Sequence, residues 1–369
     1  MRSAAPASID ARPSTGKRRP GGFLLVVCQG GAEEELCRRQ QELLPALHRG
    51  AWRRGVVTFR LPDGFDPPDD FFPDLVFARA VIRSLGQVTA ATPAELVAAA
   101  TALAGAADWA NVHVFPRDPR SETDVSAIRR ALLEACGLAA DTTAIAAPGD
   151  RVLDCVIDTA DRWWVGWHRA AAPPSRWPGG MYPVPLPADK VSRAWLKLDE
   201  AIATFGIPLG PGERACELGG APGGSCPRLL EAGLHVVGVD PALIDERVAA
   251  QPRFTHWRKR SRDVKLRDFR GFDWIVSDMN IDPVSTLEAL GRVVTAPGVR
   301  PKGIVATLKL PAWSRAEALP AWLATFREWG YAPRARQLST GGREVCVYAE
   351  RAGRPRSATR RRTTRRPGR

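Results

Sequence analysis

The 369-residue chain is predicted to be an α/β protein whose C-terminal half forms a doubly wound, mostly parallel sheet. Short apolar segments alternate with helical segments between residues 190 and 350, as they do in strand–helix–strand units. A glycine-rich turn follows one apolar strand, and charged side chains stand at the ends of several others. Ligands bind at the carboxyl ends of the strands in such sheets. The fold class therefore also predicts where a functional site lies.

Two smaller α/β modules are predicted ahead of this sheet. The first covers residues 21–85, with a helix over 33–48 and apolar strands or segments over 23–28, 55–61 and 75–84. The second covers residues 86–172, with helices over 93–107 and 124–137 and strands over 110–116, 151–159 and 162–168. Trp163, Trp164 and Trp167 in the last strand either stack on unpaired bases or pack in the core, and the alternating strand pattern favours core packing for at least two of them.

Residues 173–189 are predicted to be a linker, because six prolines in 170–189 and the pair Gly179–Gly180 prevent a regular helix or central strand. The domain over 190–350 then alternates strands at 215–218, 236–239, 274–277, 303–308 and 345–349 with helices from 227, over 283–294 and over 316–329. Residues 1–20 and the arginine-rich residues 351–369 are expected to be a disordered leader and a disordered tail.

The charge of the chain favours a polyanionic partner. The formal net charge is +13, but nine arginines and no acidic residue lie in 351–369, so the remainder carries only about +4. The seven cysteines form no C-x-x-C pair, so reduced thiols are expected and no metal site is predicted. With no long apolar segment and no signal-peptide core, we expect a cytoplasmic protein without a membrane span, most simply a monomer.

The segment 213–225 is typical of a nucleoside-cofactor site. Glu217 closes an apolar strand and runs into a turn that contains Gly219, Gly220, Pro222, Gly223 and Gly224. Asp240 ends the next strand, where an acidic side chain accepts hydrogen bonds from ribose hydroxyls. The turn lacks G-x-G-x-x-G because Ala221 replaces a glycine, and it lacks a Walker A lysine. These features together favour S-adenosylmethionine over a dinucleotide or a nucleoside triphosphate.

Four motifs in this order resemble the FtsJ-type RNA 2′-O-ribose methyltransferases, in particular their large-subunit ribosomal RNA branch. The motifs are Glu217–Gly224, Ser277–Met279 with Asp278, Thr307–Pro311 with Lys309, and Arg343–Val345 with Glu344; a further segment, Ser192–Leu198 with Lys197, precedes them and matches the family as well. The resemblance implies a Rossmann-like methyltransferase domain preceded by ferredoxin-like and THUMP-like modules. It also implies a large-subunit (23S) ribosomal RNA substrate, free or in a precursor particle, and a cytidine as the target nucleotide.

The resemblance assigns a role to each member of a Lys-Asp-Lys-Glu tetrad. Lys309 would activate the hydroxyl, either as a base with a lowered pKa or as a cation that stabilises the developing alkoxide. Lys197 and Glu344 would position it, and Asp278 would orient groups beside the methyl donor. Asp263 matches the family's acid near the adenine. Each has a simpler alternative: a solvated charge for Lys197 and Asp263, a helix N-cap for Asp278, a strand exit for Lys309, and a strand-edge ion pair for Glu344.

The chain departs from the family pattern at two places. Ser225 and Cys226 stand where an aromatic residue is usual, and Glu217 stands where aspartate is commoner. Two other functions remain open at this stage. One is a noncatalytic RNA-binding or ribosome-assembly factor on the same fold, which loss of tetrad members would indicate. The other is a nicotinamide-dependent oxidoreductase, which the absence of G-x-G-x-x-G disfavours.

Overall fold

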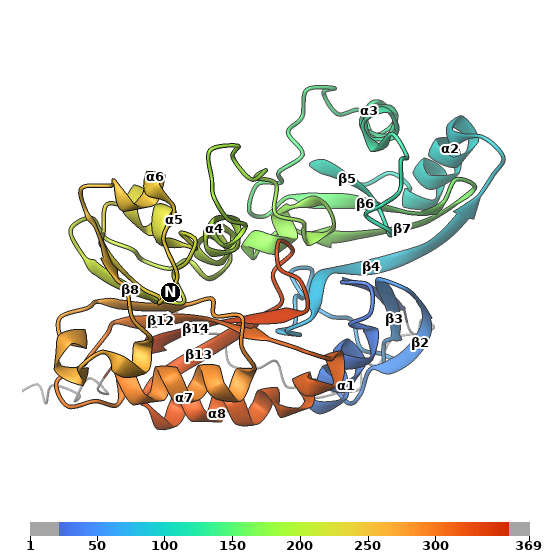
Figure 1. Ribbon diagram of the computed structural model, residues 1–369. Helices are drawn as coiled ribbons and strands as arrows, with labels where there is room; N and C mark the ends of the chain where they lie inside the picture. The colour runs from blue at the N-terminus through green and yellow to red at the C-terminus, as the bar shows by residue number, and fades with distance from the viewer. Residues whose placement is uncertain (1–21, 354–369) are drawn as a thin grey trace, which may run out of the picture.

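The computed structural model describes residues 22–353, which form two seven-stranded sheets with helices on their faces (Figure 1). The predicted leader over 1–20 lies outside the described residues, as does the predicted tail beyond residue 353. The first sheet has the order β2-β3-β1-β4-β7-β6-β5, and only β5 and β6 pair in parallel. The second has the order β10-β9-β8-β11-β12-β14-β13, in which only β14 runs against its neighbours.

The elements of the first sheet occupy the N-terminal half of the chain. Its strands are β1 (Phe23–Cys28), β2 (His48–Arg53), β3 (Val56–Arg60), β4 (Ala78–Thr89), β5 (Asn111–Pro116), β6 (Arg151–Thr159) and β7 (Arg162–Arg169). Its helices are α1 (Glu33–Leu43), α2 (Pro93–Ala104) and α3 (Val125–Ala135). The predicted linker holds only the short 3₁₀ helices η1 (Pro173–Arg176) and η2 (Pro178–Gly180), followed by irregular backbone.

The elements of the second sheet confirm the predicted alternation. Its strands are β8 (Arg214–Leu218), β9 (His235–Val239), β10 (Phe254–Trp257), β11 (Trp274–Ser277), β12 (Gly303–Lys309), β13 (Tyr331–Arg336) and β14 (Glu344–Arg351). The helices are α4 (Ala194–Phe205), α5 (Cys226–Glu231), α6 (Glu246–Ala249), α7 (Pro283–Val294) and α8 (Leu319–Glu328), with 3₁₀ turns η3 (Ser261–Asp263), η4 (Leu266–Phe269) and η5 (Trp313–Ala318).

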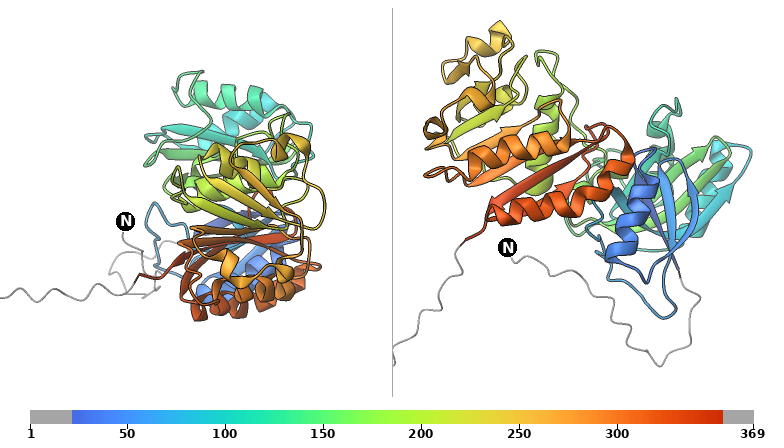
Figure 2. Two further views of the ribbon diagram at one scale, coloured as in Figure 1. Left: turned by 60° about the vertical axis from the view of Figure 1, so that its left-hand side comes forward. Right: turned by 60° about the horizontal axis from the view of Figure 1, so that its bottom comes forward.

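The second sheet is doubly wound, as the sequence predicts. Helices α4 and α5 cover one face, and α7 and α8 cover the other (Figures 1 and 2). The central strand β11 is buried along its whole length, which explains its continuous apolar sequence. Helix α7 begins where predicted because Pro283 occupies its first turn and the Asp282 side chain accepts from the backbone N–H of Ser285 at 3.1 Å.

Strand β4 joins the two predicted N-terminal modules into one sheet. It crosses the predicted boundary at residue 85, pairing with β1 on one side and with β7 on the other. The sequence analysis did not find the edge strands β2, β10 and β13. Strand β2 is exposed along its whole length and has no apolar alternation, and the helix predicted over 33–48 ends at Leu43 instead.

Apolar packing and hydrogen bonds connect the two sheets. The backbone N–H of Gln337 donates to the carbonyl of Val76 at 2.9 Å, and the Arg336 guanidinium donates to the carbonyl of Ala78 at 2.6 Å. Trp163 and Trp164 are buried, which confirms core packing for two of the three tryptophans. Among the described residues, no helix has the length and hydropathy needed to span a membrane.

Candidate active site

Four charged side chains from four different elements meet at the carboxyl ends of the parallel strands. Lys197 lies on α4, Asp278 directly follows β11, Lys309 ends β12, and Glu344 begins β14. Lys309 and Glu344 are direct partners in the antiparallel register of β12 and β14. All four members of the predicted tetrad are therefore brought together, although up to 147 residues separate them along the chain.

The tetrad forms a closed ring of alternating charges. Lys309 Nζ lies 2.8 Å from Asp278 Oδ1 and 2.5 Å from Glu344 Oε2. Lys197 Nζ lies 2.5 Å from Asp278 Oδ2 and 3.3 Å from Glu344 Oε1. Between 10% and 21% of each side chain is exposed, so these are not solvated surface charges. The N-cap alternative for Asp278 is wrong, because Asp282 caps α7.

The ring fixes the charge state of two of its members. Burial raises the pKa of Asp278, but the ammonium groups of Lys197 and Lys309 outweigh burial and hold it below its usual value. Burial lowers the pKa of Lys309, but Asp278 and Glu344 outweigh it and raise the pKa above its usual value. Lys309 is therefore an ammonium at neutral pH in the substrate-free chain.

Helix α4 contributes a second functional residue that the sequence analysis missed. Glu200 lies one turn after Lys197 and is 3% exposed. Its carboxylate accepts from the backbone N–H groups of Ser339 and Thr340, at 2.7 and 2.8 Å. These residues belong to the loop that leads into β14, so one helix positions both Lys197 and the segment before Glu344. No local sequence signal marks this contact, because Ser339 and Thr340 lie about 140 residues after Glu200.

Glu217 was predicted to contact the cofactor, but its side chain instead hydrogen-bonds to the end of the glycine-rich turn. It is fully buried, and it accepts from the Ser225 backbone N–H at 2.9 Å and from Cys226 Sγ at 2.8 Å. Burial raises its pKa to about 7, although both hydrogen bonds act in the opposite direction. The departure Ser225–Cys226 noted in the sequence thus supplies the partners of Glu217. A Cβ on Gly224 would lie 2.4 Å from Glu217 Oε1, so the turn requires glycine there.

A cleft of about 750 Å³ lies beside the tetrad. Its lining includes the predicted residues Gly219, Asp240 and Asp278, together with Met279 and Asn280. Gly219 has φ +83°, and a Cβ there would lie 2.6 Å from Met279 Cγ. Gly220, Pro222, Gly223 and Gly224 shape the turn without lining the cleft.

Asp240 stands at the end of β9, where the sequence predicts it. Its carboxylate accepts from the backbone N–H groups of Ala221 at 3.2 Å and Ala242 at 2.8 Å, and these contacts hold it at the cleft. Asp263 is not among the lining residues, and 59% of its side chain is exposed, near Arg262. The neighbouring Ser261 and Arg262 do line the cleft, because Arg292 of α7 donates to both of their carbonyls.

Comparisons with known proteins identify the domain that carries this site. Residues 190–313 match the family of FtsJ-like methyltransferases, and this part of the chain is an FtsJ-like methyltransferase domain. Over 344 residues the chain is 27% identical to the ribosomal RNA large subunit methyltransferase M of Halorhodospira halophila, covering 89% of this chain and 96% of the relative. It is 29% identical over 345 residues to the protein of the same name from Xanthomonas axonopodis, covering 90% of each.

Among solved structures, TrmN from Thermus thermophilus is 15% identical, with a TM-score of 0.35 over 89% of this chain and 99% of that one. This likeness is too low to bear on function. The family match ends at residue 313, so it includes Lys197, Asp278 and Lys309 but not Glu344. The place of Glu344 in the site depends on the register of β12 with β14.

Proposed function

We propose that this FtsJ-like methyltransferase domain transfers a methyl group from S-adenosylmethionine to a ribose 2′-oxygen of large-subunit ribosomal RNA, at a cytidine. The observation that carries the proposal is the position of Asp278. Its carboxylate contacts both lysines of the ring, and the same residue lines the cleft next to Gly219. A group bound in the cleft would therefore lie directly beside the ammonium groups.

The residues around the cleft fit an adenosine-containing cofactor. Asp240 at the end of β9 would accept hydrogen bonds from ribose hydroxyls, and the Gly219 turn permits close approach of the backbone. The segment with Ser261 and Arg262, fixed by Arg292, would border the base. Bound S-adenosylmethionine supplies an electrophilic methyl carbon on sulfur. A contact between Asp263 and the adenine of the cofactor stays a proposal. It requires the charged segment that contains Asp263 to move toward the cleft.

Lys309 is proposed as the residue that activates the ribose hydroxyl. Two of its three N–H bonds are directed to Asp278 and Glu344, which leaves one to donate to the 2′-oxygen. The methyl carbon would exchange its bond to sulfur for a bond to the 2′-oxygen, and the hydroxyl proton would pass to water. The Lys309 ammonium would stabilise the negative charge that the oxygen gains as the proton leaves, while Lys197 and Glu344 keep Lys309 in position. Because the raised pKa keeps Lys309 charged, this role is favoured over that of a general base.

Ribosomal RNA is proposed as the substrate for two reasons. The relatives that match about 90% of this chain are named ribosomal RNA methyltransferases, and the chain is basic. The relatives extend over the N-terminal half as well, so residues 21–85 and 86–172 are proposed to grip RNA as ferredoxin-like and THUMP-like modules. Cytidine is proposed only from the family resemblance. The predicted monomer and the predicted domain ranges also stay proposals.

The test is mass-spectrometric mapping of ribose methylation on unmodified large-subunit RNA and on precursor particles, with labelled S-adenosylmethionine. Wild-type protein should produce one 2′-O-methyl mark, and Lys309→Ala should lower the rate by about 100-fold to 1,000-fold. Lys302→Ala is the matched control. Lys302 directly precedes the opposite end of β12 and also pairs with two carboxylates, Glu213 at 2.6 Å and Asp273 at 3.0 Å.

The outcomes separate the proposed functions. A mark that disappears in Lys309→Ala and persists in Lys302→Ala supports the proposal and identifies the nucleotide. Cofactor binding without any mark on free RNA or particles would favour the noncatalytic assembly factor. Binding of a nicotinamide cofactor without S-adenosylmethionine would contradict the proposal and favour an oxidoreductase.

A further inference from the structure

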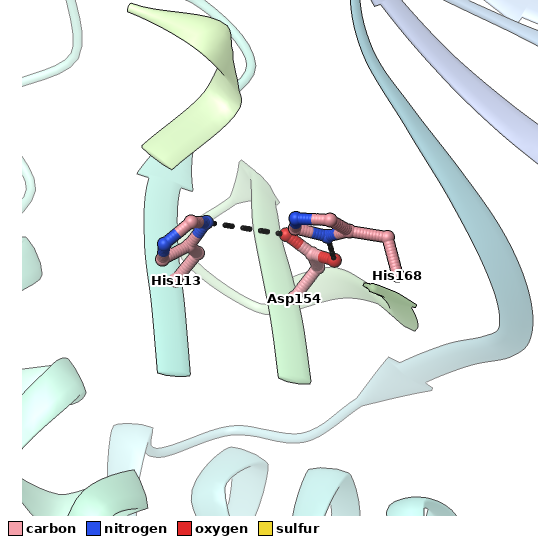
Figure 3. A group of neighbouring side chains, drawn as sticks. All are labelled: His113, Asp154 and His168. Carbon is pink, nitrogen blue, oxygen red and sulfur yellow. Dashed lines mark hydrogen bonds and ion pairs between the residues drawn. The ribbon is translucent and has the colours of Figure 1, made fainter. Parts of the chain in front are cut away.

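The N-terminal sheet holds a buried group of ionisable side chains that the proposed methyl transfer does not use. His113 lies on β5, Asp154 on β6 and His168 on β7, three neighbouring strands (Figure 3). His113 and Asp154 are direct partners in the parallel register. His168 lies two residues beyond Gly166, the antiparallel partner of Asp154, so all three side chains project from the same face.

This group is more deeply buried than the catalytic tetrad. The exposed fractions are 0% for His113, 1% for Asp154 and 7% for His168. Helices α2 and α3 pack on the opposite face of the sheet, with Val112, Val114 and Leu153. Segment η1 covers the group, because Ser175 contributes a backbone carbonyl to it. The three side chains thus lie between the sheet and the predicted linker.

The hydrogen bonds of His168 require a cation between it and Asp154. A carbonyl can only accept, so His168 Nε2, at 2.7 Å from the Ser175 carbonyl oxygen, carries a hydrogen. In a neutral ring Nδ1 then carries a lone pair, and this atom lies 2.5 Å from Asp154 Oδ2. Either a proton or a metal ion must lie between these atoms. A backbone carbonyl on the far nitrogen is the usual outer partner of a metal-bound histidine.

His113 distinguishes a metal ion from a proton. The Ala144 backbone lies close to the His113 ring, but neither ring nitrogen makes a hydrogen bond of normal geometry, and Asp154 Oδ1, 3.8 Å from His113 Nδ1, makes none either. A proton on His168 would leave these three buried atoms without partners, at about 1–3 kcal/mol each.

We propose that His113, Asp154 and His168 bind a zinc ion that fastens the segment around Ser175 to the N-terminal sheet. The ligand atoms lie within 4.8 Å of one another. Zinc bonds of about 2.0–2.2 Å place tetrahedral ligands about 3.3–3.6 Å apart, so the distances of 2.5 and 3.8 Å need adjustments of about 1 Å or less, and the longest distance, at most 4.8 Å, needs an adjustment of up to about 1.5 Å. Two histidines and one carboxylate are a usual protein ligand set for zinc, and a water molecule would complete the tetrahedron.

The first test is elemental analysis of the full chain, purified without a polyhistidine tag and without chelator. We expect stoichiometric zinc, and after exchange with Co²⁺ we expect the visible absorption bands of tetrahedral cobalt. Competition with a zinc indicator should show that His113→Phe weakens binding by at least about 100-fold, more than loss of an outer partner does. The control is His235→Gln, which changes an exposed histidine on β9 and should bind zinc like wild type.

Zinc should also raise the unfolding temperature of wild type and of the control but not that of His113→Phe, because a ligand that binds only the folded chain stabilises it. If His113→Phe does not fold, His113→Asn replaces it. Wild-type protein without zinc and without cobalt bands would overturn the proposal, since only water and protons would then fill the site. Equal zinc affinity in wild type and the His113 variant would also overturn it.

Discussion

The two buried groups of ionisable side chains differ in whether they are complete by themselves. In the ring of Lys197, Asp278, Lys309 and Glu344, each lysine contacts two carboxylates and each carboxylate contacts two lysines. In the group around Asp154, both nitrogens of His113 and one oxygen of Asp154 lack a partner. The ring contains two positive and two negative charges, so its charges are balanced in the absence of a ligand. The second group has buried polar atoms without partners, which is the basis of the zinc proposal.

The largest expected effect separates two carboxylates within the ring. Asp278→Asn should lower kcat by at least about 1,000-fold and also weaken S-adenosylmethionine binding, because Asp278 belongs both to the ring and to the cleft. Glu344→Gln should lower kcat by about 100-fold and leave cofactor affinity unchanged, because Glu344 contacts the lysines but does not line the cleft. Single-turnover kinetics and calorimetric titration with the cofactor measure the two quantities. Equal loss of cofactor affinity in both variants would contradict the assignment.

The next effect concerns the buried acid beneath the glycine-rich turn. The pKa of Glu217 is raised by burial to about 7 in the folded chain, against 4.5 for a free carboxyl. Between these values the folded state keeps a proton that the unfolded state has lost, so stability falls as pH rises from 4.5 to 7. The shift corresponds to about 3 kcal/mol over this range.

Glu217→Gln should remove this decline, because the amide does not ionise. Urea unfolding measured across the same pH range provides the test. Glu213→Gln is the control: Glu213 directly precedes β8, and its pKa is not raised, because Lys302, Trp274 and the Gly210 backbone N–H outweigh burial and lower it. This control should retain the wild-type decline. An unchanged pH dependence in Glu217→Gln would show that Glu217 does not titrate in this range.

The smallest effect tests the comparison of the two groups directly. Lys309→Met should destabilise the chain by about 2 kcal/mol, because Asp278 and Glu344 then face each other with one cation fewer. In metal-free buffer His113→Phe should be neutral or stabilising, because it removes two buried nitrogens that have no partner. Denaturant unfolding of both variants measures the difference. If both variants were destabilised to the same extent, the group around Asp154 would be stabilised by its own contacts as much as the ring is, and the contrast between the two groups would be wrong.

The sequence predicted those features that depend on neighbouring residues. Helix α7 was predicted with its correct bounds, although not with its correct cap, and the residues that determine its start in the structure, Asp282 and Pro283, are adjacent in the sequence. The tetrad was predicted because each member lies in a short motif at a strand end or on a helix. Parallel strands bring such ends to the same edge of the sheet, so the fold class was sufficient to expect Asp278 and Lys309 close together, whereas Lys197 and Glu344 were assigned only by the family resemblance.

Only the tertiary structure decided the contacts between segments distant in the sequence. The bonds from Glu200 to the loop before β14 span about 140 residues, and no motif marks them. Edge strand β2 lacks a buried face, so its sequence has no alternation, and its position depends on pairing with β3. His113, Asp154 and His168 stand in three strands with no metal-binding spacing. Their approach follows from strand order and register, which depend on the packing of the whole sheet and not on any local pattern.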